Sequence, residues 1–204
     1  MKLYYPIKPV FITQKFGERP EVYKQFGLNS HNGVDFRTKF DDTPLGKRYV
    51  YAAADGKILK LGNEGNKGYG KYVQLTHTGG AQTLYAHLHK FYVKEGQKIK
   101  VGEKIALTDN TGFSSAPHLH FGYRPAGYDY FNGNKGYVDP FPFFVSFTSL
   151  ENRVKETLAP KVIEPLPRTW KDAMKDVIEM LEIKNPTDEN KEFARRIKIV
   201  WTNN

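Results

Sequence analysis

The sequence contains no cysteine. This absence excludes disulfide bonds, thiolate nucleophiles and thiolate-bound metals together, so any metal site must use His, Asp and Glu side chains. The chain also has no apolar run close to the roughly 18 residues that a membrane span requires, and we expect no membrane span. The first residues lack an apolar segment followed by a small-residue cleavage site, so we also expect no signal peptide.

Charge is unevenly distributed along the 204 residues, whose formal net charge is +9. Residues 1–148 carry 20 Lys and Arg against 12 Asp and Glu, a balance of +8, whereas residues 149–204 carry 11 against 10. A basic surface on the first part favours polyanionic partners, and nucleic acid, an anionic membrane and an anionic cell-wall polymer all satisfy this condition. Charge alone does not choose among them.

The first part of the chain consists of short segments rich in Val, Ile, Tyr and Thr, which Gly, Asn and Asp interrupt at close intervals. This pattern is typical of a β-rich fold. Two turn-and-strand units are nearly repeated within residues 94–105, and we expect Gly96 and Gly102 in their turns to adopt positive φ. The clearest predicted strands are residues 49–52, 56–61, 72–75, 82–85 and 104–107.

Beyond residue 148 the pattern changes. Three prolines between residues 160 and 167 predict a linker, because proline cannot continue a regular helix. Apolar residues then recur at helical spacing from Trp170 to Leu181, and Phe193, Ile197 and Trp201 form a second such stripe. The sequence thus predicts a β domain over residues 1–148, a Pro-containing linker over 149–168 and a short C-terminal α-helical segment over 169–204. Such stripes are usually packed as core, and docking to a partner is the alternative.

Histidine spacing is the most informative feature of the sequence. Two pairs have one residue between them, His87-Leu88-His89 and His118-Leu119-His120, and in a strand this spacing directs both rings to the same face. The second pair follows a turn-rich segment, residues 111–117, which places it at the start of a predicted strand. The two remaining histidines are His31 and His77.

His31 and Asp35 offer further metal ligands. A loop histidine followed four residues later by Asp, with Gly33 between them to let the backbone bend, can bring an imidazole and a carboxylate onto one cation. With a second histidine they would form a three-ligand site whose fourth position is open to water, as in catalytic zinc sites. Zinc lowers the pKa of its bound water to about 7 and polarises a carbonyl. A histidine outside the ligand set can then serve as general base or stabilise an oxyanion.

Six blocks of the sequence, in order, carry a family resemblance. Across about residues 10 to 125 the chain resembles the lysostaphin-type zinc endopeptidases of peptidoglycan. The blocks are Ile12-Thr13-Gln14-Lys15-Phe16-Gly17-Glu18-Arg19, His31-Asn32-Gly33-Val34-Asp35-Phe36, Ala53-Ala54-Asp55-Gly56-Lys57-Ile58, Gly70-Lys71-Tyr72-Val73, Thr83-Leu84-Tyr85-Ala86-His87-Leu88 and residues 111–121, which include His118-Leu119-His120.

The resemblance implies both a fold and a set of roles. The fold would be a domain of two antiparallel β-sheets with a groove. Loops would form the walls of this groove, and a peptide would bind in it. One zinc ion would be bound by His31, Asp35 and His120. His118 would be the base that activates water, and His87 would lie across the cleft to orient water or stabilise the oxyanion.

Other residues have weaker assignments. His77 and His89 are interpreted as structural or cleft-lining. Six further residues are candidates for lining a groove, although packing is the usual role for most tyrosines. They are Tyr85, Tyr123, Arg124, Tyr128, Tyr130 and Tyr137.

The sequence therefore predicts a zinc endopeptidase that hydrolyses peptide cross-links or stem peptides of bacterial peptidoglycan, with anionic wall polymers as further partners. We expect a monomer that acts on the cell wall, released by lysis or carried by a phage particle. The alternatives are a catalytically silent wall-binding relative, although no ligand is lost, and a phage tail-tip component. Nucleic-acid binding ranks below them, because no recognition motif accompanies the scattered basic residues.

Overall fold

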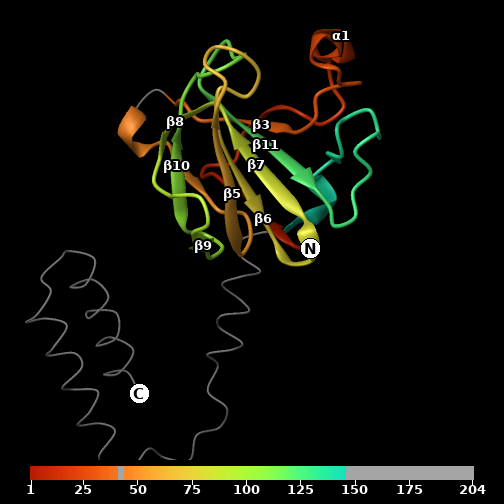
Figure 1. Ribbon diagram of the computed structural model, residues 1–204. Coiled ribbons are helices and arrows are strands. Elements are labelled where there is room, and N and C mark those ends of the chain that lie inside the picture. The colour runs from red at the N-terminus through yellow and green to blue at the C-terminus, as the bar shows by residue number, and fades with distance from the viewer. Residues whose placement is uncertain (41–43, 146–204) are drawn as a thin grey trace, which may run out of the picture. The chain divides into compact units, whose positions relative to one another are not determined.

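The computed structural model describes residues 1–40 and 44–145. A seven-stranded sheet forms its centre, and in Figure 1 the strands β3, β11, β7, β6 and β5 lie side by side. All neighbouring strands of this sheet are antiparallel. In sheet order the strands are β2 (Ile12–Gln14), β3 (Val34–Arg37), β11 (His118–Arg124), β7 (Gln82–Ala86), β6 (Lys71–Thr76), β5 (Gly56–Asn63) and β9 (Lys98–Ile99).

Smaller elements complete the described part. A three-stranded antiparallel sheet contains β4 (Tyr49–Tyr51), β10 (Lys104–Thr108) and β8 (Leu88–Phe91). A short parallel pair joins β1 (Leu3–Tyr4) to β12 (Phe144–Val145). Within the described residues the one α-helix is α1 (Pro20–Tyr23), and the 3-10 helices are η1 (Lys24–Phe26), η2 (Leu45–Lys47), η3 (Thr78–Gly80) and η4 (Phe141–Phe143).

Side-chain alternation along β11 separates the core from the opposite face of the sheet. Leu119, Phe121 and Tyr123 are at most 1% exposed and belong to the main hydrophobic cluster, together with Val34 and Phe36 of β3. Successive side chains of a strand point to opposite faces, so the intervening residues of both strands lie on the other side of the sheet. Burial of each large apolar side chain stabilises the fold by roughly 1.5–3 kcal/mol. These five residues therefore determine which face of the sheet packs against the core.

The opposite face carries a smaller cluster. Tyr72, Leu84 and Ala86 project from β6 and β7 and pack with Tyr137. Gly122 of β11 lies directly under the Tyr137 ring, where a Cβ would come within 2.7 Å of Cε1. This face is therefore only partly covered by apolar groups, and the rest of it is available for polar side chains.

The predicted mainly β, antiparallel fold is confirmed. Each predicted strand coincides with an observed strand to within two residues: β4, β5, β6, β7 and β10. The two turn units also have the expected geometry, with Gly96 at φ 79° and Gly102 at φ 80°. The predicted linker, residues 149–168, and the predicted helices of residues 169–204 lie outside the described residues, so the proposed domain division stays a prediction. No helix in the described ranges is long and apolar enough to cross a membrane.

Two glycines allow the loop before β6 to meet the loop before β11. Gly70 has φ 58° and Gly112 has φ 79°, and a Cβ on either would collide with the backbone of the other loop. Backbone hydrogen bonds join the loops here, from Phe113 N to Gly68 O at 2.9 Å. The close approach matters because the second loop leads directly into His118.

We expect Gly112→Ala to lower the free energy of unfolding by roughly 3 kcal/mol, because it adds backbone strain at positive φ to a collision with the backbone of Gly70. Gly102→Ala is the matched control: its φ is 80°, yet nothing lies within 4 Å of the added Cβ, so its loss should be about 1 kcal/mol. Chemical denaturation of both variants measures the difference. Equal losses would show that the close approach of the loops contributes nothing.

Candidate metal and catalytic site

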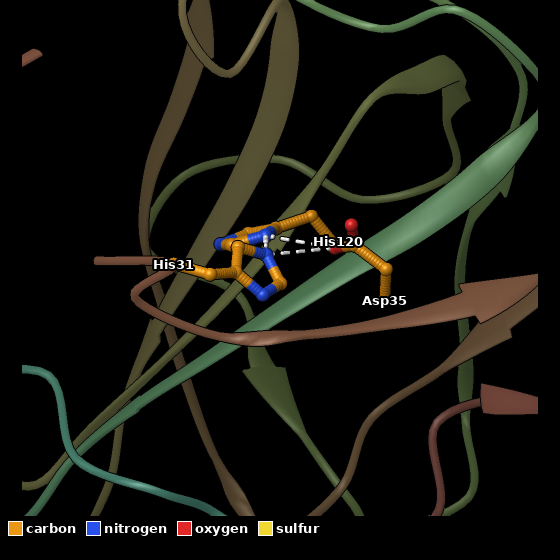
Figure 2. Close-up of side chains that lie close together, drawn as sticks. All are labelled: His31, Asp35 and His120. Carbon is orange, nitrogen blue, oxygen red and sulfur yellow. Dashed lines mark hydrogen bonds and ion pairs between the residues drawn. The ribbon is translucent and has the colours of Figure 1, made fainter. Parts of the chain in front are cut away.

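His31, Asp35 and His120 come together at the centre of the polar face of the sheet. Asp35 of β3 and His120 of β11 are direct cross-strand partners, and His31 lies three residues before β3 in the sequence. Figure 2 shows the two imidazoles and the carboxylate pointing toward one another. All three residues are buried. The elements that place them are thus two adjacent antiparallel strands and the loop that enters one of them.

The three potential ligand atoms form a nearly equilateral triangle. His31 Nε2 lies 2.9 Å from His120 Nδ1 and 3.1 Å from Asp35 Oδ1, and His120 Nδ1 lies 3.0 Å from Asp35 Oδ1. Ligands bonded tetrahedrally to zinc at about 2.0–2.1 Å stand about 3.3 Å apart. A small expansion of this triangle therefore accommodates a zinc ion.

The tautomer of His31 is fixed by the backbone. Its Nδ1 lies 2.8 Å from the carbonyl oxygen of Lys15, and because a carbonyl can only accept, Nδ1 must donate its hydrogen there. This leaves the lone pair of Nε2 directed at the cluster. His120 makes its polar contacts within the described residues through Nδ1 alone, since its Nε2 is buried without a partner. Both rings therefore present a nitrogen to the same point, as a metal requires.

Gly33 permits the approach of His120. A Cβ at this position would lie 2.6 Å from His120 Cε1 and 2.6 Å from the carbonyl oxygen of Phe121. The glycine between His31 and Asp35 is thus needed for close contact between the loop and β11. The sequence predicted that Gly33 lets the backbone bend, but its φ is not positive. The absence of a side chain at Gly33 therefore matters more than its backbone freedom.

The electrostatics keep the carboxylate ionised. Burial alone would raise the pKa of Asp35, but its contacts with His120 and His31 outweigh burial and hold the pKa well below its usual range. Burial lowers the pKa of His120. An anionic carboxylate beside an uncharged His120 imidazole is the protonation state that a divalent cation needs.

His118 and His87 flank this triad. Nε2 of His118 lies 3.6 Å from Asp35 Oδ2, and the His118 and His87 rings have centroids 4.5 Å apart. His118 Nδ1 donates to the carbonyl oxygen of Ala116 at 2.8 Å, and His87 Nδ1 donates to that of Thr111 at 2.7 Å. In both rings, therefore, Nε2 is left as a hydrogen-bond acceptor.

The backbone at His87 departs from the expected strand. His87 lies between β7 and β8 with φ 60°, so His87 and His89 do not share a strand face, and the same-face interpretation of this pair is wrong. The His89 side chain is 44% exposed and lies 3.5 Å from Asp109. His87 itself is buried, and burial followed by the nearby His118 lowers its pKa to about 3. By contrast, His118 and His120 do lie on one face of β11.

His77 is remote from the triad in its contacts. It is buried, with Nδ1 2.7 Å from the carbonyl oxygen of Asp55 and Nε2 2.8 Å from Thr83 Oγ1. Both ring nitrogens are therefore satisfied by structural partners, in agreement with its structural interpretation.

A cleft of about 1170 Å³ opens above the triad, and its lining includes Asp35, His87, His118 and His120. Sequence reasoning assigned no role to Tyr23, whose ring centroid lies 5.0 Å from that of His31 and which also lines the cleft. Burial, followed by the charge of Asp35, raises the pKa of Tyr23 to about 12. No spacing pattern could have found it, because Tyr23 ends a helix of only four residues, too short to show a periodic pattern.

Five of the six suggested groove residues, Tyr85, Tyr123, Tyr128, Tyr130 and Tyr137, do not line the cleft. Tyr85 and Tyr123 are at most 1% exposed and pack in the main core. Arg124 does line the cleft. Asn32 and Tyr69 line it as well, with Asn32 Nδ2 donating to the Tyr69 hydroxyl at 2.6 Å. Sequence reasoning noted Asn32 within the block that begins at His31, but gave it no function.

The fold and this site together define a metallopeptidase with two histidines, one carboxylate and two flanking histidines. The family profile of Peptidase family M23 matches residues 29–140. The chain therefore belongs to peptidase family M23, whose members use zinc, and the predicted zinc cofactor and enzyme class are confirmed at the level of the family.

Relatives in bacteria have names that agree with this assignment. An uncharacterized metalloprotease of Haemophilus influenzae is 44% identical over 100 residues, which is 49% of this chain and 20% of the relative. Peptidoglycan DD-endopeptidase ShyB of Vibrio cholerae is 36% identical, over 57% of this chain and 26% of the relative. Glycyl-glycine endopeptidase ALE-1 of Staphylococcus capitis is 38% identical, over 59% of this chain and 31% of the relative. The chain thus spans less than a third of the length of these relatives.

Solved structures share the fold. The catalytic domain of the antimicrobial peptidase lysostaphin from Staphylococcus simulans is 31% identical with a TM-score of 0.52, over 66% of this chain and 91% of that chain. A zinc-containing peptidase from Vibrio cholerae is 32% identical with a TM-score of 0.51, over 68% of this chain and 39% of that chain. The predicted likeness to lysostaphin-type enzymes is confirmed.

We expect His120→Ala and Asp35→Ala to reduce zinc affinity by more than about 100-fold, because each removes an atom of the ligand triangle. His89→Ala is the control, since it removes an exposed imidazole from the same part of the chain without touching the triangle. Elemental analysis of the purified, folded variants gives the zinc stoichiometry. Stoichiometric zinc in His120→Ala would rule out this ligand set.

Proposed function

We propose that the protein is a zinc-dependent endopeptidase that hydrolyses peptide bonds of bacterial peptidoglycan, in cross-links or in stem peptides, and so acts on the cell wall. The observation that carries this proposal is the ligand triangle of His31, Asp35 and His120 with two acceptor imidazoles beside it, at the floor of a cleft large enough for a peptide. The peptidoglycan endopeptidases among the relatives support the substrate class.

Each residue has a role that follows from its geometry. His31, Asp35 and His120 would hold the zinc ion. When bound, zinc supplies Lewis acidity that polarises a peptide carbonyl and makes water more acidic. His118 serves as general base, because its Nε2 is an acceptor on the cleft side and its Nδ1 is anchored to Ala116. The proton that Nε2 takes from the attacking water then passes to the leaving amine, which completes hydrolysis.

The geometry favours one of the two roles considered for His87. With Nδ1 donating to Thr111 and a pKa lowered to about 3, its ring is neutral and Nε2 has no hydrogen to donate. An oxyanion requires a donor, whereas a water molecule can donate to an acceptor. His87 is therefore assigned to orient the attacking water. His118 protonated at Nε2 would be stabilised by Asp35, 3.6 Å away.

The scissile bond and the biological setting remain at the level of prediction. Anionic wall polymers are suitable further partners, because the cleft lining includes five cationic residues and two acidic ones. A lytic enzyme or phage-borne protein fits the same site chemistry, as does a monomeric bacterial enzyme. The catalytically silent alternative is less favoured, because every ligand and both flanking histidines are present.

The direct test is to incubate the protein with cross-linked peptidoglycan and to follow newly released amines by mass spectrometry. We expect cleavage that a chelator abolishes and added zinc restores, and the fragment masses identify the bond. Intact fragments from several types of wall, with zinc bound to the protein, would support the silent binding protein instead.

A second test separates the base from the ligands. We expect His118→Ala to retain zinc and to lower kcat/KM by about 10²- to 10⁴-fold, the usual contribution of a positioned general base. Elemental analysis and steady-state kinetics on a soluble muropeptide measure the two properties, with His89→Ala as the control. A His118→Ala variant with unchanged rates would remove His118 from the mechanism.

A further inference from the structure

Arg124 occupies the same face of β11 as the two histidines of the site. His118, His120, Gly122 and Arg124 alternate with the core residues of this strand, and Arg124 lines the cleft that contains the ligand triangle. The strand thus carries the site histidines at its start and a guanidinium at its end. Four residues separate His120 from Arg124, or roughly 13 Å at the rise of a β-strand.

The guanidinium is held in a defined position. The Arg124 carbon Cζ lies 4.2 Å from the ring centroid of Tyr137, 5.1 Å from that of Tyr128 and 5.9 Å from that of Tyr130. Its Nη1 donates to Gln82 Oε1 at 3.2 Å, and its Nε is buried without a hydrogen-bond partner. Ring contacts and one hydrogen bond to a neutral amide therefore fix the side chain.

In contrast to Lys100 and Arg48, Arg124 forms no ion pair with a carboxylate of the described residues. Lys100 pairs with Asp55 at 2.8 Å, and Arg48 pairs with Asp109 at 3.5 Å. Arg124 is half-buried, and a cation taken out of water without an anion carries a free-energy cost. A guanidinium offers five N–H donors, and the described residues accept from one of its nitrogens. The unsatisfied donors suit a planar anion from outside.

The surroundings add to this preference for an anion. The cationic residues lining the cleft are Arg19, Arg37, Lys39, Arg124 and Lys135, and the acidic ones are Asp35 and Glu64. Because Asp35 belongs to the ligand triangle, Glu64 is the one acidic side chain of the lining left to oppose five cations. The cleft therefore favours a substrate that carries negative charge.

We propose that Arg124 anchors a free carboxylate of the substrate peptide, in a subsite at the opposite end of the cleft floor from His118. This inference rests on the peptidase function proposed above and adds a determinant of specificity to it. An extended peptide advances about 3.3–3.6 Å per residue, so the carboxylate lies about four residues from the scissile bond. A substrate in which that carboxylate is amidated binds more weakly.

A purely structural role for Arg124 predicts a different result. If Arg124 only packs its stem against the tyrosines, its loss weakens the fold and affects all substrates equally. If it anchors a carboxylate, its loss removes most of the discrimination between an ionised and an amidated substrate. The ratio of affinities for the two substrates therefore separates the roles, whatever happens to stability.

The probe is a pair of purified cross-linked muropeptides that differ only in having free or chemically amidated carboxylates. Calorimetric titration of the zinc-loaded His118→Ala protein, which retains the cleft, should give about 10- to 100-fold tighter binding of the free-carboxylate form. The double variant with Arg124→Gln should lose most of this preference. Arg124→Lys should recover part of the preference, because it keeps the charge and loses the planar fork.

Arg37→Gln is the charge-matched control, since Arg37 lines the same cleft but stacks on Phe11 and Phe40. It should leave most of the preference for the free-carboxylate form in place, because Arg37 contributes only to the general field of the cleft. Equal binding of the two forms by the parent protein, or a preference that Arg124→Gln leaves largely intact, overturns the subsite. Failure of the parent to bind either form, together with failure of the wild type to cleave peptidoglycan, would overturn the peptidase proposal itself.

Discussion

The register between β3 and β11 is the constraint on which the site depends. His120 pairs with Asp35 across the two strands, while Val34, Phe36, Leu119 and Phe121 point to the other side, each with no measurable exposure. Slipping the pairing by one residue would reverse every side chain of a strand. At roughly 1.5–3 kcal/mol for each buried apolar side chain, the core sets the register. The polar cluster is placed by residues that take no part in its chemistry.

This placement brings the three potential ligand atoms to face one another. Bringing Asp35 and the imidazoles out of water is unfavourable: burial lowers the pKa values of His87 and His120, while the contacts of Asp35 with His120 and His31 hold the pKa of Asp35 low. Backbone carbonyls at Lys15, Ala116 and Thr111 then select the tautomers. A site on rigid strands with its protons already positioned needs little reorganisation when metal binds.

The extent of sequence-based prediction follows from this architecture. His118 and His120 were found because period-two spacing within a strand is a local property. The approach of His31 and Asp35 to them is not local, and it was suggested by ligand chemistry and the family resemblance. The structure gives His87 φ 60° between two strands, which spacing alone does not reveal and which invalidated the same-face argument for His89. Tyr69 reaches the cleft from a loop whose path depends on the tertiary contacts at Gly70 and Gly112, and Tyr23 reaches it from the end of the short helix α1.

The two-residue period of β11 places His118 and His120 on one face of the sheet. The same period determines which other residues of the strand can contact a substrate. Because Leu119, Phe121 and Tyr123 face the core, positions 118, 120, 122 and 124 all face the other side of the sheet, where His118, His120 and Arg124 line the cleft. Gly122 leaves room for Tyr137, and Tyr137 in turn covers the guanidinium of Arg124. Catalytic and recognition residues on one strand are held at a spacing that loop motion does not alter. On the function proposed above, the distance from scissile bond to carboxylate is therefore set by the sheet, and substrates would be selected by length as well as by charge.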